Sequence, residues 1–285
     1  MSTDTNARLV LPGEEPSSPP AVSRPPGGSI WDDGTPTPEE LDVTNWLLTT
    51  TRSNRKTLDM DRPVPLDVIE ECLEISLQAP TAHNTQRWHW IVVDDRKKIE
   101  AIADVYRRTW LQTTRGAKRP GRRFKASTES NAKYSKIEDS TQWFADNMHR
   151  VPLMVVPCVT GVRYDDAMVG RQWVQAMEAA ARGPATGLEG RVPSALWIYS
   201  GFFATIYPAV WQFQLALRAR GLGSTLTVNH LANEDLTAEI LELPGGVTQA
   251  CLLPVAYTTK RTFKPALRQP LASKLSYNTF EGTRE

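Results

Sequence analysis

The feature that most restricts how this 285-residue chain can fold is a run of 26 consecutive residues without a charge, Val192–Leu217. Its length would allow a transmembrane helix. However, the run contains Gln212, Gln214 and Pro208, and no second run of this kind occurs in the sequence. We therefore expect a helix buried in a protein core or a subunit interface rather than a membrane span.

The second half of this run has clear helical periodicity. Val210, Phe213 and Leu217 share one face of a helix predicted over Ile206–Arg220. Gly221 follows directly and is typical of the residue that ends a helix in a left-handed conformation.

The composition excludes several classes of protein. The 33 Lys and Arg residues balance 32 Asp and Glu residues, which argues against a dedicated nucleic-acid-binding protein. The three cysteines form no CxxC pair, which excludes a disulfide scaffold and the standard zinc modules and favours a reducing cytoplasm. The four histidines lack metal-binding spacing, so we expect no metal site.

The N-terminal segment differs from the rest of the chain. Residues 1–40 hold eight of the 21 prolines and have almost no apolar periodicity, which predicts a disordered tail. No apolar stretch typical of a secretory signal occurs there, so we expect a cytoplasmic protein. Residues 41–285 are predicted to form one domain, whose first short helix starts near Leu41.

Helices and strands alternate along this domain. The patterns predict, in order, a helix over Pro65–Ala79, a strand over Trp88–Asp95, a helix over Arg96–Arg108, a strand over Val151–Val159, a short helix capped by Asn233, and a strand over Ala250–Thr258. This alternation indicates an α/β or α+β protein.

A basic stretch interrupts the pattern at residues 107–125, which carry eight cations and no acid. It is either a lid over an anionic ligand or a solvated loop, and charge runs more often face water. Segments 107–145 and 160–190 are predicted to be insertions or a lid.

Two catalytic motifs are present only in part. Gly221-Leu-Gly223 follows a helix rather than a strand, and Leu226 replaces the third glycine of a dinucleotide fingerprint. Ser53–Lys56 matches the SxxK of serine β-lactamases, but the SDN and KTG motifs are absent. We discount both interpretations.

Two polar segments remain as candidates for a site. Arg52-Ser53-Asn54-Arg55 places two guanidiniums beside a hydroxyl, a set that can bind a phosphate, although a solvated helix end would have the same composition. Ala79–Trp88 is rich in amides and hydroxyls that could meet the edge of a heterocycle, and it could equally be an ordinary connection.

Together these segments resemble the FMN-dependent nitroreductases, above all those of mycobacteria and other actinobacteria. The family pattern runs from RRSxR through APSxxNxQPW to a GLG turn and a late arginine. The corresponding segments here are Arg52–Arg55, Ala79–Trp88, Gly221–Ser224 and Ala266–Pro270. The sequence departs from the pattern at Thr51, Arg87 and His230, which bears on substrate preference.

The resemblance implies an α+β, three-layer α-β-α sandwich that binds FMN at a homodimer interface. It implies a phosphate site at Arg52, Ser53 and Arg268, and a pyrimidine edge at Arg55 and Asn84. The full implied set of cofactor-binding residues is Arg52, Ser53, Asn54, Arg55, Pro80, Thr81, Ala82, Asn84, Gln86, Thr227, His230, Leu231 and Arg268.

The implied activity is that of an oxidoreductase that takes electrons from NADH or NADPH and passes them, by ping-pong kinetics, to nitroaromatics, quinones or related acceptors. The flavin itself carries the hydride, so no side chain need be catalytic. Two alternatives stay open: the same fold with another flavin reaction (reductive dehalogenation, ene reduction or flavin destruction), and a protein that sequesters FMN without turnover. The resemblance implies no nucleic-acid or membrane partner.

Overall fold

The computed structural model describes residues 36–115, 128–161, 196–260 and 262–282. These residues fall into two compact units. The larger unit comprises Arg52–Thr259, and the smaller one contains the described residues on either side of it.

The larger unit is built on an antiparallel sheet in which β1, β6, β3 and β2 are neighbours in that order, while β4 pairs with β6 and β5 with β3. The strands are β1 (Leu58–Asp59), β2 (Trp88–Val93), β3 (Leu153–Thr160), β4 (Leu222–Ser224), β5 (Val247–Gln249) and β6 (Leu253–Thr258). The predicted strands at Trp88–Asp95, Val151–Val159 and Ala250–Thr258 correspond to β2, β3 and β6.

Strand β3 lies between two hydrophobic cores and contributes side chains to both. Met154 and Val156 point into one core, and Leu153 and Val155 point into the other. Successive side chains of a strand point to opposite faces, so a strand that is apolar throughout must be covered on both sides.

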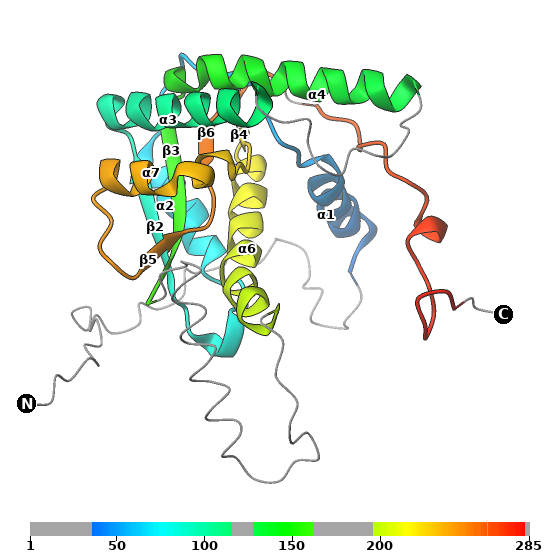
Figure 1. The fold of residues 1–285 in the computed structure, drawn as a ribbon. Helices are drawn as coiled ribbons and strands as arrows, with labels where there is room; N and C mark the ends of the chain where they lie inside the picture. Colours follow the sequence, from blue (N-terminus) through cyan, green and yellow to red (C-terminus); the bar gives the residue numbers. More distant parts are fainter. Residues whose placement is uncertain (1–35, 116–127, 162–195, 261, 283–285) are drawn as a thin grey trace, which may run out of the picture. The chain divides into compact units, whose positions relative to one another are not determined.

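Helices provide that cover on both faces. The helices of this unit are α2 (Leu66–Ser76), α3 (Arg96–Arg115), α4 (Thr128–Asn147), α6 (Leu196–Ala219) and α7 (Glu234–Ile240), with short 3-10 turns η1 (Ala82–Asn84), η2 (Met148–Arg150) and η3 (Asn229–Asn233). Residues of α3 and α4, which lie side by side in Figure 1, fill one core, whereas α2 and α6 fill the other. The unit is therefore an α+β, three-layer α-β-α sandwich, as predicted.

Helix α6 accounts for the described part of the uncharged run. It begins at Leu196, ten residues before the predicted start, and buries Val210, Phe213 and Leu217 as expected. Gly221 follows with φ +75, the left-handed conformation predicted for it. No helix in the described part of the chain is long and apolar enough to cross a membrane.

The smaller unit contains α1 (Pro38–Thr50) and the C-terminal segment with the turn η4 (Leu271–Ser273). Helix α1 begins three residues before the predicted start because Thr37 and Glu40 form a capping box. The Thr37 N–H donates to Glu40 Oε2 at 2.8 Å, and the Glu40 N–H donates to Thr37 Oγ1 at 3.3 Å.

Three other elements differ from the prediction. Helix α3 continues to Arg115, so the first part of the basic stretch is helical, and α4 was not predicted at all. Asn233 is the N-cap residue of α7, as predicted, but its side chain makes no cap hydrogen bond. Its amide instead donates to Thr109 Oγ1 at 2.7 Å and to Gln112 Oε1 at 3.2 Å, which links η3 to α3. The rest of the basic stretch and the predicted 160–190 insertion lie almost wholly outside the described residues.

Candidate functional site

The Arg52–Arg55 segment is held against the sheet by its own backbone and by one buried amide. The Asn54 N–H donates to the Ser224 carbonyl at 2.9 Å. The Asn54 side chain donates to the Arg52 carbonyl and accepts from Thr57 Oγ1, both at 2.9 Å. Asn54 is buried with its amide engaged in fixing this turn, whereas Arg52 and Ser53 are exposed.

The second glycine of the GLG turn permits this close approach. A Cβ on Gly223 would lie 2.5 Å from Thr258 Cγ2 and 2.7 Å from Asn54 Nδ2, distances that real Cβ contacts do not show. Glycine at this position lets β4 lie directly beneath the Arg52–Arg55 turn.

Arg55 extends from this turn toward residues far away in the sequence. Its Nε is buried and has no hydrogen-bond partner among the described residues. Burial raises the pKa of Tyr106, and a hydrogen bond with Thr227 and the nearby charge of Arg55 oppose that rise. The Tyr106 phenol is thus influenced by both Thr227 and the charge of Arg55. Tyr106 was not among the predicted site residues, although a hydroxyl on the apolar face of the helix predicted over Arg96–Arg108 is a signal in the sequence.

The loop between α2 and β2 has an unusual backbone. His83, Asn84 and Gln86 have φ values of 54, 51 and 47, in the left-handed region that residues other than glycine rarely adopt. Gln86 supports this shape, because its N–H donates to Thr81 Oγ1 at 3.2 Å and its side chain donates to Asn84 Oδ1 at 3.1 Å. Backbone strain of this kind clusters at functional sites.

Within one chain, this loop and the Arg52–Arg55 turn lie toward opposite ends of α6. Helix α2 runs antiparallel to α6, since Arg220 bonds to Glu71 at 3.2 Å and Gln212 bonds to the Ile75 carbonyl at 2.7 Å. The loop after α2 therefore reaches the N-terminal half of α6, against which η1 packs (Figure 1). The Arg52–Arg55 turn instead bonds to β4, just beyond the C-terminal end of α6. The length of helix between them is on the order of 20 Å.

His230, at the start of η3, is completely buried. Burial lowers the pKa of its imidazole to about 4, and a contact with the side chain of Gln249 opposes the shift only weakly. Neither ring nitrogen makes a hydrogen bond of normal geometry with any residue that the structure describes. The imidazole is therefore uncharged near neutral pH, and of this stretch Val228 and Leu231, rather than His230, have exposed surface.

Val228 and Leu231 line a cavity of about 530 Å³, which we call the aromatic cavity. Helix α6 contributes Phe202, Phe203 and Tyr207 to its wall, and the polar part of the wall includes Glu234 and Gln249. The cavity thus adjoins one predicted cofactor segment, Thr227–Leu231.

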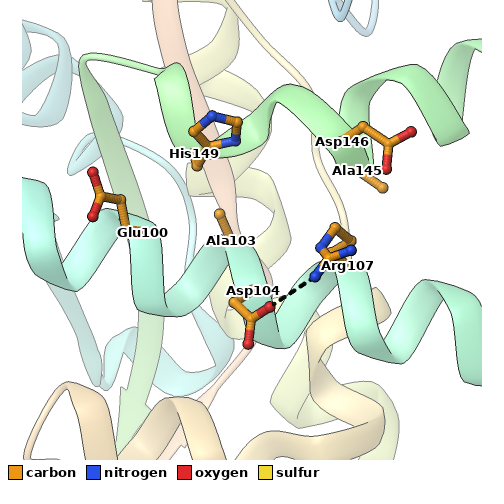
Figure 2. Close-up of a pocket in the computed structure, with 7 residues that line it drawn as sticks. All are labelled: Glu100, Ala103, Asp104, Arg107, Ala145, Asp146 and His149. Carbon is orange, nitrogen blue, oxygen red and sulfur yellow. Dashed lines mark hydrogen bonds and ion pairs between the residues drawn. The ribbon is translucent and has the colours of Figure 1, made fainter.

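Figure 2 shows a second, smaller cavity of about 310 Å³ between α3 and the end of α4. Its wall includes Glu100, Asp104 and Arg107, but none of the predicted site residues. Asp104 pairs with Arg107 at 3.4 Å and with Arg108 at 2.8 Å, exposed pairs of the kind found on helix surfaces. We assign no site to this cavity.

Residues 48–188 of the chain match the family model described as the Nitroreductase family. The chain has a nitroreductase-family fold.

Solved structures agree with this assignment at low sequence identity. A BluB-like flavoprotein from Clostridium difficile 630 is 16% identical, with a TM-score of 0.55 over 83% of this chain and 99% of that one. Oxidized iodotyrosine deiodinase, bound to FMN and 3-iodo-L-tyrosine, is 18% identical, with a TM-score of 0.54 over 82% and 98%. The hypothetical oxidoreductase YcnD from Bacillus subtilis is 18% identical, with a TM-score of 0.52 over 84% and 74%. No curated protein gives a significant match to the sequence.

The three cysteines of this chain are not reactive thiols. Cys72, Cys158 and Cys251 are all buried and free. Burial raises the pKa of Cys72 to about 11 and that of Cys158 to about 12, and it also raises the pKa of Cys251. None of the three is a thiolate nucleophile at neutral pH.

The last predicted phosphate ligand of the nitroreductase pattern, Arg268, belongs to the smaller unit. It is exposed, and its guanidinium donates to the Leu267 carbonyl at 3.3 Å. Its grouping with Arg52 and Ser53 remains a prediction.

Proposed function

We propose that this chain is an FMN-dependent NAD(P)H oxidoreductase of the nitroreductase type. One observation carries the proposal: the buried Arg55 Nε has no acceptor within the described part of the chain. A buried donor without a partner costs about 1–3 kcal/mol, and more when it is charged. The residues fit FMN, because a carbonyl or ring nitrogen at the pyrimidine edge of its flavin would be the missing acceptor beside Arg55.

The other proposed contacts with FMN come mainly from the two polar segments, Arg52–Arg55 and Ala79–Trp88. Arg52, Ser53 and Arg268 would hold the phosphate, and Asn84 and Gln86 would meet the polar edge of the ring. Pro80, Thr81 and Ala82 would pack on the flavin ring. Asn54 would hold the Arg52–Arg55 turn in the shape that binds the phosphate. Thr227, His230 and Leu231 would border the reactive side. When bound, FMN supplies hydride transfer from NADH or NADPH and reduction of a nitroaromatic, quinone or related acceptor.

We further propose that two copies of the chain form each site. Members of this family are commonly dimeric. A separation on the order of 20 Å along α6 leaves one copy unable to bring both Arg55 and Asn84 to the same ring edge. A two-fold axis would bring the turn of one copy to the loop of the other. The buried, free cysteines suit a reducing cytoplasm, where NADH and NADPH are available.

The test is an anaerobic titration of the purified full chain. We expect about one FMN per chain, bleaching of the flavin absorbance by NADH or NADPH, and recovery on adding a nitroaromatic or a quinone. Parallel double-reciprocal lines would match one shared site used in turn. A protein that purifies without flavin and does not bind added FMN would refute the proposal. Flavin that binds but is not reduced by either nicotinamide would indicate sequestration instead.

A further inference from the structure

One wall of the aromatic cavity is made of aromatic rings that contact one another. The rings of Phe203 and Tyr207 are stacked, with centroids 5.4 Å apart and an angle of 14° between their planes. Phe202 meets Phe203 edge to face at 5.2 Å. The Tyr207 hydroxyl donates to the Ala250 carbonyl at 3.1 Å and fixes the ring. A volume of about 530 Å³ bordered by fixed aromatic faces suits a planar small molecule.

The polar side of the cavity carries one carboxylate. Gln249, which is 2% exposed, donates from Nε2 both to the Glu234 carbonyl and to Glu234 Oε1, each at 3.1 Å. This fixes the position of the carboxylate without neutralising it. In the part of the chain that the structure describes, no Lys or Arg pairs with Glu234, and none lines the cavity.

The aromatic rings and the Glu234 carboxylate together favour a positively charged ligand. An anionic ligand would face the Glu234 carboxylate with no cation to compensate it, whereas a cation would pair with Glu234 and also interact with the aromatic faces. We propose that the aromatic cavity binds aromatic cations, with the ring of the ligand against the aromatic wall formed by Phe202, Phe203 and Tyr207 and an ammonium or amidinium group on Glu234.

Because Val228 and Leu231 lie in both the cavity wall and the segment proposed to border the flavin, the ligand would be the electron acceptor, and this last step rests on the proposed function. The binding itself does not depend on it. The anionic phosphates of the nicotinamide donor would lie outside this cavity.

Isothermal titration calorimetry with three ligands that share an indole ring tests the charge preference. Tryptamine is a cation, 3-ethylindole is neutral and indole-3-propionate is an anion. For the full chain we expect tryptamine to bind about tenfold tighter than either of the others. Glu234→Gln keeps the acceptor for Gln249 and should abolish this preference. Glu239→Gln, on the same helix but outside the cavity wall, should retain it.

Two further measurements are ligand binding by Phe203→Leu and the FMN content of each sample. Phe203→Leu should weaken all three ligands alike, and the side chain is 40% exposed, so the fold should tolerate the change. Failure of tryptamine to bind, a preference for the anion, or an unchanged preference in Glu234→Gln would overturn the proposal. FMN content measured on the same samples separates the two ideas. Protein without flavin that still prefers tryptamine would contradict only the proposed function, whereas flavin-loaded protein without this preference would contradict only the cavity assignment.

Discussion

Buried nitrogen atoms of two basic side chains, Arg55 Nε and both ring nitrogens of His230, have no hydrogen-bond partner among the described residues, and the two side chains differ in how they can respond. An imidazole can lose its proton, and burial lowers the pKa of His230 to about 4. A guanidinium does not lose its proton at physiological pH, so Arg55 keeps a buried charged donor. The pKa of His230 therefore differs between the folded and the unfolded chain, whereas the Arg55 Nε stays a charged donor that an acceptor from a ligand would satisfy.

The His230 shift predicts how stability depends on pH. Above about pH 6.5 the imidazole is neutral in both the folded and the unfolded chain and adds no pH dependence. Between about 6.5 and 4 only the unfolded chain takes up the proton, so the free energy of unfolding should fall as the pH falls, by up to about 3 kcal/mol. Urea unfolding of His230→Gln should have a shallower slope in this window. Equal slopes in both proteins would contradict the buried, neutral imidazole.

The unpartnered Arg55 Nε predicts a loss of flavin affinity. Arg55→Met keeps most of the side-chain length but removes the charged donor, so FMN should bind roughly ten- to a hundredfold more weakly. Flavin fluorescence quenching measures this affinity. Arg150→Met, which removes only a surface pair with Asp61, is the control and should bind FMN normally. Unchanged affinity in Arg55→Met would remove the main support for the proposed function.

At the scale of elements, the close contact between β4 and the Arg52–Arg55 turn depends on the absence of a side chain at Gly223. Gly223→Ala places a methyl group against Thr258 and Asn54, and overpacking of this kind should lower the free energy of unfolding by about 1–3 kcal/mol. Gly245→Ala is the matched control, because no atom lies within 4 Å of its added Cβ. Chemical denaturation of both variants makes the comparison. If Gly223→Ala is as stable as Gly245→Ala, the close packing inferred for this turn is wrong.

At the scale of the whole molecule, the opposite placement of the two polar segments along α6 predicts complementation between variants. Arg55→Met and Asn84→Ala should each bind FMN weakly when alone. In a mixed dimer with a site shared between copies, one of the two sites would combine an intact Arg55 with an intact Asn84. Unfolding and refolding equal amounts together should therefore restore about a quarter of the wild-type sites. No recovery would mean that one copy holds both segments.

Local features of this protein were readable from its sequence. The buried faces of α3 and α6 and the helix end at Gly221 depend on periodicity and on the conformational freedom of glycine, which are properties of neighbouring residues. The motif resemblance predicted the α-β-α sandwich. Helix α4 was missed because its sequence contains few apolar residues and they form no clear stripe.

The placement of the candidate site required the folded structure. Nothing near Arg55 in the sequence indicates that its charge acts on Tyr106, or that the Asn54 side chain holds the turn instead of facing solvent. The side chain of Asn233 matched a helix cap by type but is used in contacts with α3. In each case the role of the side chain depends on residues that are distant along the chain and become neighbours only after the sheet and α6 have packed. Local sequence patterns do not encode which distant residues become neighbours.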